Sequence, residues 1–278
     1  MKLGFHVSIE GGVDRAVNRA KELGCSTFQI FTRSPRMWKH RELEEGEVQA
    51  FKLKLRDSGI SPVFSHMPYL PNLSSPKDDM FRRSVETLVV EAARCRLLDI
   101  PYLVTHLGST LGSGYEAGVE RIAKAFSHLG SGSPMLLIEN TSGKRNEVGS
   151  TFRELRDIID STEGLRLGVC LDTCHAYARG YDVKSEEGFE ATIDEFDEII
   201  GLRNLHLVHL NDSKGPRGSR IDRHEHIGLG EIGDDGFRNI LSSRLREAPM
   251  VMETPADERR GDGENMMKVY QLAGLHVG

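Results

Sequence analysis

The sequence predicts an α/β protein: a single (β/α)8 (TIM) barrel over residues 1–278, with its active site at the carboxyl ends of the strands. Two observations support this fold. Short apolar runs rich in Val, Ile, Leu and Phe alternate with longer segments of helical periodicity, which is typical of parallel strands joined by crossover helices. Eight such units follow one another without a Ser/Gly-rich linker, which favours one closed barrel over a divided chain.

The elements follow in a regular order. The predicted strands are residues 3–8, 27–32, 62–67, 102–106, 135–140, 168–173, 205–212 and 249–254. The predicted helices are residues 13–23, 46–57, 79–98, 115–129, 151–161, 185–200, 235–243 and 264–272. The segments after the second, sixth and seventh strands are richest in charge and turn residues, so we expect them to form the loops of the active face.

The main alternative fold is an open, doubly wound sheet. That fold more often carries a Gly-rich phosphate loop after its first strand. Here Gly11-Gly12 follows the first strand without the GxGxxG spacing, so the sequence favours the barrel.

Composition limits the class of protein. The chain has 278 residues, 38% of them hydrophobic and 28% charged, which is typical of a soluble globular protein. Its formal charge of −6 argues against a protein that coats DNA non-specifically. The amino terminus does not resemble a signal peptide, and no apolar stretch approaches the roughly 20 residues of a membrane span, so we expect a cytoplasmic protein. The cysteines at 25, 95, 170 and 174 are expected to be reduced thiols in the core.

Polar residues recur at the carboxyl ends of six consecutive predicted strands. They are His66, His106, Glu139, Asp172, His209 and Glu253. Carboxylates gathered around one axis repel one another unless cations neutralise them. Imidazoles mixed with carboxylates, without paired thiolates, are typical ligands of Zn, Mn or Fe at catalytic sites. The pattern therefore predicts a metal centre on the active face.

A second group of candidate ligands follows. Asp222-x-His224 in an extended segment places both side chains on one side of the chain, and His175 lies three residues after Asp172. The candidates then number nine, whereas one ion needs three or four protein ligands. We therefore expect a cluster with a shared carboxylate that bridges two ions, an arrangement suited to hydrolysis of a phosphate ester.

These residues lie in motifs that resemble the endonuclease IV family of apurinic/apyrimidinic (AP) endonucleases over nearly the whole chain. The motifs are Gly4-Phe-His6-Val-Ser with Gly11-Gly12, Phe31-Thr-Arg-Ser-Pro-Arg36-Met-Trp38, His66-Met-Pro-Tyr69-Leu, Thr105-His106-Leu-Gly, Ile138-Glu139-Asn140-Thr141, Leu171-Asp-Thr-Cys-His175-Ala, and His209-Leu-Asn-Asp-Ser-Lys214 running on to Asp222-Arg-His224. The resemblance implies a monomeric (β/α)8 barrel of base excision repair that holds three zinc ions and binds duplex DNA containing abasic sites. Mn²⁺ or Fe²⁺ could replace zinc at some sites.

The resemblance also divides the nine ligands. It implies a first ion held by His66, His106 and Glu139, with Glu139 bridging to a second. Asp172, His209 and Glu253 would complete the second site, and His175, Asp222 and His224 would hold the third ion. A hydroxide shared by the first two ions would attack the phosphate 5′ to the base-less sugar, leaving a 3′-hydroxyl and a 5′-deoxyribose phosphate. Glu139 would be the catalytic residue that orients or deprotonates the water.

DNA contacts are implied in the same way. Extrusion of a nucleotide costs least where no base remains, and Arg36, Tyr69 and Leu70 match the positions that fill the resulting gap. Basic side chains of the loop after the seventh strand would reach phosphates; they are Lys214, Arg217, Arg220 and Arg223. His6 matches the family pattern without an assigned role. Residues 142–146 are more basic than the Gly-rich turn that the family often has there.

Two other functions are compatible with parts of the pattern. A xylose-isomerase-like sugar isomerase or epimerase would share the barrel and hold one or two divalent ions at the strand ends. It would not need the third set of ligands or the pair His66 and His106. A metal-stabilised protein that binds nucleic acid without catalysis would need no complete set of strand-end ligands.

Overall fold

Eight parallel strands form the centre of the fold. The computed structural model describes residues 1–275, and the prediction of one domain over residues 1–278 extends to three residues outside that part. The strands are β1 (Leu3–Phe5), β2 (Phe28–Ile30), β3 (Val63–His66), β4 (Tyr102–Thr105), β5 (Met135–Glu139), β6 (Leu167–Asp172), β7 (Leu205–His209) and β10 (Met250–Met252). They are hydrogen-bonded in the order β1-β10-β7-β6-β5-β4-β3-β2.

The two ends of this sheet meet. His6 follows β1, and Gln29 lies in β2. These two residues form a parallel bridge, and the Val7 amide donates to the Gln29 carbonyl at 2.8 Å. The predicted (β/α)8 barrel is therefore confirmed.

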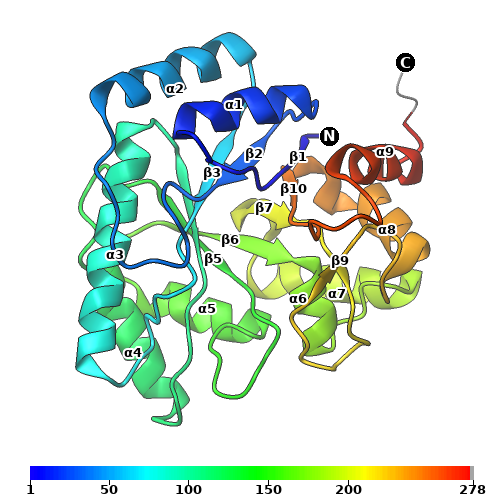
Figure 1. Ribbon diagram of the computed structural model, residues 1–278. Coiled ribbons are helices and arrows are strands. Elements are labelled where there is room, and N and C mark those ends of the chain that lie inside the picture. Colours follow the sequence, from blue (N-terminus) through cyan, green and yellow to red (C-terminus); the bar gives the residue numbers. More distant parts are fainter. Residues whose placement is uncertain (276–278) are drawn as a thin grey trace.

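Helices surround the strands (Figure 1). Those that connect or follow the barrel strands are α1 (Val13–Glu22), α2 (Glu45–Ser58), α3 (Asp78–Leu97), α4 (Tyr115–Phe126), α5 (Phe152–Ser161), α7 (Glu186–Ile199), α8 (Gly233–Ser242) and α9 (Asp262–Leu272). Short 3-10 helices lie at Leu202–Asn204 and Arg244–Glu247. Most predicted helix boundaries are correct to within two residues, but α4 ends at Phe126 rather than at residue 129.

Two parts of the fold differ from the sequence prediction. A short helix, α6 (Thr173–Arg179), begins directly after β6, because the Asp172 carboxylate accepts the His175 amide hydrogen and caps it. The predicted strand 205–212 is interrupted after His209. Residues Asp212–Ser213 form β8, which leaves the barrel and pairs antiparallel with β9 (His224–Glu225).

The interior of the barrel is filled by one buried residue from each of six strands. These residues form a cluster of their own, separate from the larger core between the sheet and the helices: Phe64, Val104, Leu137, Cys170, Leu207 and Val251. All four cysteines are buried and unpaired, as predicted. Within residues 1–275, no helix combines the length and apolar character needed to cross a bilayer.

The closure of the barrel between β1 and β2 leaves no room for a side chain at Gly4. A Cβ atom built on Gly4 would lie 1.7 Å from the Thr27 carbonyl oxygen, so one of the two strands would have to move. We expect Gly4→Ala to lower the free energy of unfolding by about 2–3 kcal/mol, measured by urea denaturation. Gly46→Ala is the control, since a Cβ there meets nothing within 4 Å. Equal stability of both variants would contradict this contact.

Candidate metal centre

The six predicted strand-end residues all face the barrel axis. Each follows one of the six interior residues by two positions: His66 follows Phe64, and Glu139 follows Leu137, for example. Side chains two positions apart on a strand point to the same side of the sheet. The six strand-end residues therefore form a polar layer next to the apolar layer in the barrel interior. The barrel thus brings together six residues from six different strands.

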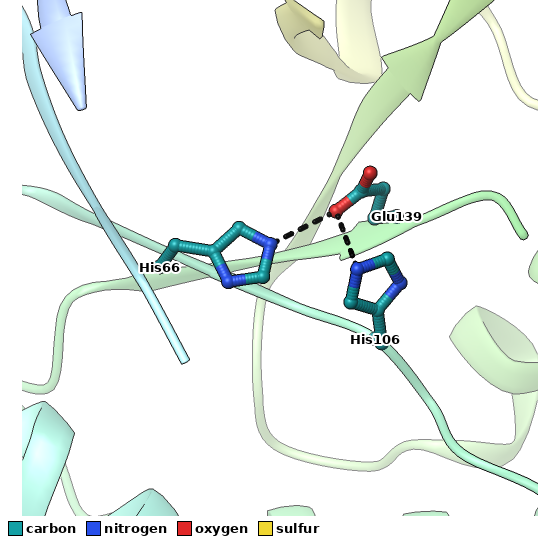
Figure 2. Close-up of side chains that lie close together, drawn as sticks. All are labelled: His66, His106 and Glu139. Carbon is teal, nitrogen blue, oxygen red and sulfur yellow. Dashed lines mark hydrogen bonds and ion pairs between the residues drawn. The ribbon is translucent and has the colours of Figure 1, made fainter. Parts of the chain in front are cut away.

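The first group consists of His66, His106 and Glu139. His66 Nε2 and His106 Nε2 lie 3.1 and 3.5 Å from the same oxygen of Glu139, Oε2. Figure 2 shows both rings directed at this atom. Their ligand atoms lie within 4.8 Å of one another, close enough for one metal ion.

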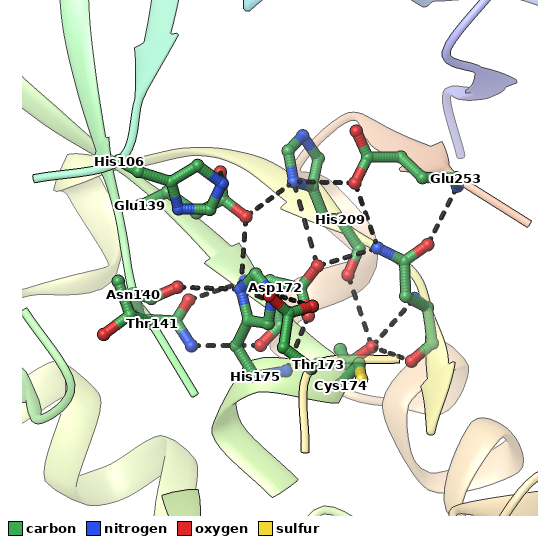
Figure 3. A network of polar contacts seen from close by, with 12 residues as sticks. His106, Glu139, Asn140, Thr141, Asp172, Thr173, Cys174, His175, His209 and Glu253 are labelled. Carbon is green, nitrogen blue, oxygen red and sulfur yellow. Dashed lines mark hydrogen bonds and ion pairs between the residues drawn. The ribbon is translucent and has the colours of Figure 1, made fainter. Parts of the chain in front are cut away.

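The second group forms around the other oxygen of Glu139. His209 Nδ1 lies 3.1 Å from Glu139 Oε1, 3.5 Å from Glu253 Oε2 and 3.9 Å from Asp172 Oδ2. Figure 3 shows this network of contacts. Because Glu139 directs one oxygen to each group, its carboxylate has the geometry of a bridge between two ions.

The third group combines α6 with the β8–β9 hairpin. Asp222 Oδ1 lies 3.1 Å from His175 Nε2 and 4.0 Å from His224 Nε2, and the three ligand atoms form a possible metal site. The hairpin is anchored by the buried Asp212 carboxylate, which accepts amide hydrogens from Gly228, Gly230 and Ile232 at 2.9–3.0 Å. The structure therefore gathers all nine candidate ligands, although their binding of metal stays a prediction.

The orientation of the imidazoles supports metal binding. In four of the five rings, the nitrogen that faces away from its group lies close to an oxygen that can accept its hydrogen. The distances are 2.6 Å from His66 Nδ1 to the Met67 carbonyl, 2.9 Å from His175 Nδ1 to the Asn140 carbonyl, 3.0 Å from His209 Nε2 to Gln29 Oε1, and 3.2 Å from His224 Nδ1 to the Glu253 carbonyl. Metal-binding histidines show this pattern, because it leaves the other nitrogen free to coordinate.

The charges in the centre depend on one another. Burial by itself would raise the pKa of Glu139, but the charges of His106 and His209 outweigh this effect and hold the pKa well below its usual value. Burial likewise would lower the pKa of His175, but its carboxylate neighbours, Asp172 first among them, raise it well above its usual value. The imidazoles and carboxylates of the centre thus shift one another's pKa values.

Two buried cysteines lie close enough to the centre to be considered as ligands. Cys170 lies near Glu139 and His209, and Cys174 lies near Asp172 and His224. Burial raises the pKa of each thiol to about 12. Burial thus favours the protonated thiols, whereas the thiolate is the coordinating form, so the imidazoles and carboxylates are the preferred ligands.

A cavity of about 1030 Å³ opens above the centre. Five of the seven residues predicted to contact DNA line it: Arg36, Tyr69, Leu70, Lys214 and Arg223. Tyr69 is 60% exposed, with its ring edge against Phe31 at a centroid distance of 5.1 Å. The loop that carries Arg36 is attached to α3 by a buried ion pair, in which Arg33 Nε lies 2.6 Å from Glu91 Oε1.

The other two predicted DNA contacts lie outside the lining of this cavity. Arg217 donates to the Gly180 carbonyl at 2.7 Å and pairs with the Asp182 carboxylate at 3.0 Å, so it fastens its loop to the end of α6. Arg220 lies on the same loop with a positive φ of 58°. A role for either residue in binding DNA stays a prediction.

The structure adds polar residues to which the sequence assigned no role. Asn140 exchanges two hydrogen bonds with the Asp172 backbone, and Asn211 Nδ2 donates to Asp172 Oδ2 at 2.7 Å. Lys144 Nζ lies 2.8 Å from Asp222 Oδ2, the oxygen opposite the one that faces the histidines. Gln29 contacts His209 and Glu253. Gln29 was detectable only as a polar residue within an apolar run.

The fold and this centre define a class of protein: a TIM-barrel enzyme whose strand ends can hold metal ions. Residues 17–270 match the family model described as a xylose isomerase-like TIM barrel. The chain is also similar to solved sugar epimerases, such as a D-tagatose 3-epimerase-like protein with a TM-score of 0.72, but at 18% identity this likeness concerns the fold alone.

More similar proteins identify the family. The chain is 52% identical to a probable endonuclease 4 from Methanoculleus marisnigri, over 98% of this chain and 99% of that protein, and 50% identical to one from Cenarchaeum symbiosum, over 99% and 100%. The crystal structure of endonuclease IV from Thermus thermophilus superposes with a TM-score of 0.86 at 38% identity, over 99% of this chain and 98% of that one. The chain belongs to the endonuclease IV family of AP endonucleases, as the sequence motifs predicted.

Proposed function

We propose that this protein hydrolyses the phosphodiester bond 5′ to an abasic site in duplex DNA, leaving a 3′-hydroxyl and a 5′-deoxyribose phosphate. The family supports an endonuclease of DNA repair. The observation that carries the proposal is the arrangement of imidazoles and carboxylates around Glu139, which suits several metal ions at once. An isomerase of the same fold has no use for a third group of ligands, so the centre favours the nuclease.

We infer three zinc ions per chain. His66, His106 and Glu139 would hold the first, Glu139 with Asp172, His209 and Glu253 the second, and His175, Asp222 and His224 the third. The donor set also suits Mn²⁺ or Fe²⁺. Bound zinc lowers the pKa of water and neutralises the charge of a phosphodiester that is being attacked.

The side chains of the protein have separate tasks in this proposal. Glu139, which is buried, would orient or deprotonate the attacking water. Arg36, Tyr69 and Leu70, on the cavity wall, fill the gap left by the missing base.

Positive charges near the mouth of the cavity complete the binding surface. Lys214 and Arg223 line the cavity and would bind phosphates beside the break. Arg217 and Arg220 would contact DNA farther out on the same loop. The monomeric state, the cytoplasmic location and the single domain over residues 1–278 are further parts of the proposal.

The central test uses a duplex with a tetrahydrofuran abasic analogue, which cannot undergo β-elimination. Purified protein with zinc restored should nick this duplex on the 5′ side of the analogue and leave an extendable 3′-hydroxyl, detected by gel electrophoresis and polymerase extension. An undamaged duplex is the control. No nicking by zinc-loaded protein would rule out the proposed activity.

Glu139 can be tested by a neutral, isosteric change. Because Gln cannot accept the proton or carry the bridging charge, Glu139→Gln should lower the rate of nicking by about 10²–10⁴-fold, while binding to the abasic duplex persists in a gel-shift assay. Glu147→Gln is a matched control, since Glu147 also lines the cavity but contacts none of the nine candidate ligands. Near-normal turnover of Glu139→Gln would refute the role of Glu139.

Zinc affinity should depend on pH. Because the pKa values of His175 and His209 are raised well above the usual imidazole value in the metal-free protein, zinc must compete with protons for both rings. Affinity should therefore rise with pH, by up to about tenfold per unit for each proton released. Competition with a chromophoric chelator between about pH 6 and about pH 8 measures this slope. A flat profile would contradict the assignment of these ligands.

A further inference from the structure

The polar layer above the barrel interior has eight members, not six. His6 follows β1 and Gln29 lies in β2, and these two residues form the bridge that closes the barrel. Both lie next to Glu253 on the axis side: His6 Nδ1 is 3.3 Å and Gln29 Nε2 is 3.0 Å from Glu253 Oε1. The proposed division of metal ligands uses neither residue.

The contacts of Gln29 determine which way its amide group points. Gln29 Nε2 lies 3.0 Å from Glu253 Oε1 and donates to this carboxylate oxygen. A carboxylate only accepts hydrogen bonds, so the atom of Gln29 that faces Glu253 must be the amide nitrogen. The same nitrogen lies 2.9 Å from His6 Nδ1, which accepts its second hydrogen. The reverse orientation would place two oxygens against each other in a fully buried position.

This orientation decides the state of His209. The amide oxygen of Gln29 must face His209 Nε2, and their distance is 3.0 Å. Because an amide oxygen only accepts, the hydrogen of His209 belongs on Nε2. The other nitrogen, Nδ1, lies 3.1 and 3.5 Å from Glu139 Oε1 and Glu253 Oε2, so it is the nitrogen that can give up its hydrogen and present a lone pair to a metal ion between these oxygens.

We propose that Gln29 is a positioning residue of the second metal site: one amide group selects the coordinating tautomer of His209 and holds the outer oxygen of Glu253. The inner oxygen, Oε2, is thereby left facing His209. The inference rests on the proposed function, since it concerns the second of the three inferred ions. His6 belongs to the same arrangement, because it occupies the remaining hydrogen of the amide.

The test compares zinc binding by wild-type protein, Gln29→Met and Thr27→Val. Met has nearly the length of Gln but forms none of the three hydrogen bonds that the Gln29 amide group makes with Glu253, His6 and His209. Thr27 is equally buried on the same stretch of chain and donates to the Pro62 carbonyl, away from the centre, so Thr27→Val controls for the loss of a buried hydrogen bond. Chelator competition should show one zinc ion bound about 10–100-fold more weakly in Gln29→Met, with the other two unchanged. Thr27→Val should keep all three affinities.

A spectroscopic measurement does not depend on whether the variant folds. Long-range ¹H–¹⁵N spectra of the zinc-loaded wild-type protein should show the hydrogen of His209 on Nε2 and none on Nδ1. The opposite tautomer would overturn the inference, and so would zinc affinities in folded Gln29→Met equal to those of the wild type. Failure of the proposed function is recognised separately, because wild-type protein would then bind fewer than three zinc ions or fail to nick the tetrahydrofuran duplex.

Discussion

The requirement that buried carboxylates be neutralised governs the architecture of this protein. Glu139 and Asp172, which are buried, converge with the partly buried Glu253 at the carboxyl end of the barrel, and such a gathering of negative charge is expensive away from water. Imidazoles placed between the acids lower that cost, and metal ions would lower it further. Glu139 is the focus of the arrangement, since each of its oxygens serves a different group of histidines. An open sheet could not present these side chains to one another, because they come from strands all around a closed circle.

Much of the site followed from a simple periodicity in the sequence. Apolar runs such as Leu136–Ile138 are followed by a polar residue at a position where the side chain points into the barrel. Glu139 and the corresponding residues of the other strands could therefore be predicted from the sequence alone. The apolar runs also predicted the order of strands and helices. Family motifs then supplied the division of ligands, which neither periodicity nor composition determines.

Other features depend on contacts that no local pattern reveals. Gln29 occupies an inward position in a strand of otherwise apolar character, and its importance arises only from His209 and Glu253, about 180 and 224 positions away along the chain. The interruption of the seventh strand was missed because the apolar alternation continues past His209. The Asp212 carboxylate accepts hydrogen bonds from backbone amides of residues 228–232. This tertiary interaction outweighs the strand propensity of residues 210–212. Arg217 was expected near DNA because it is basic, and its contacts with the Gly180 carbonyl and the Asp182 carboxylate could not be predicted from the sequence.

The β8–β9 hairpin gives the centre a modular construction. The first two groups of ligands lie in the barrel strands or directly follow them, so a change in them disturbs the barrel. Asp222 and His224 belong to an excursion between β7 and α8, which is held by Asp212 from below and by Lys144 from the neighbouring loop. Two of the three members of the third group therefore come from one surface connection, so a change in its length would alter this group while every strand stays as it was.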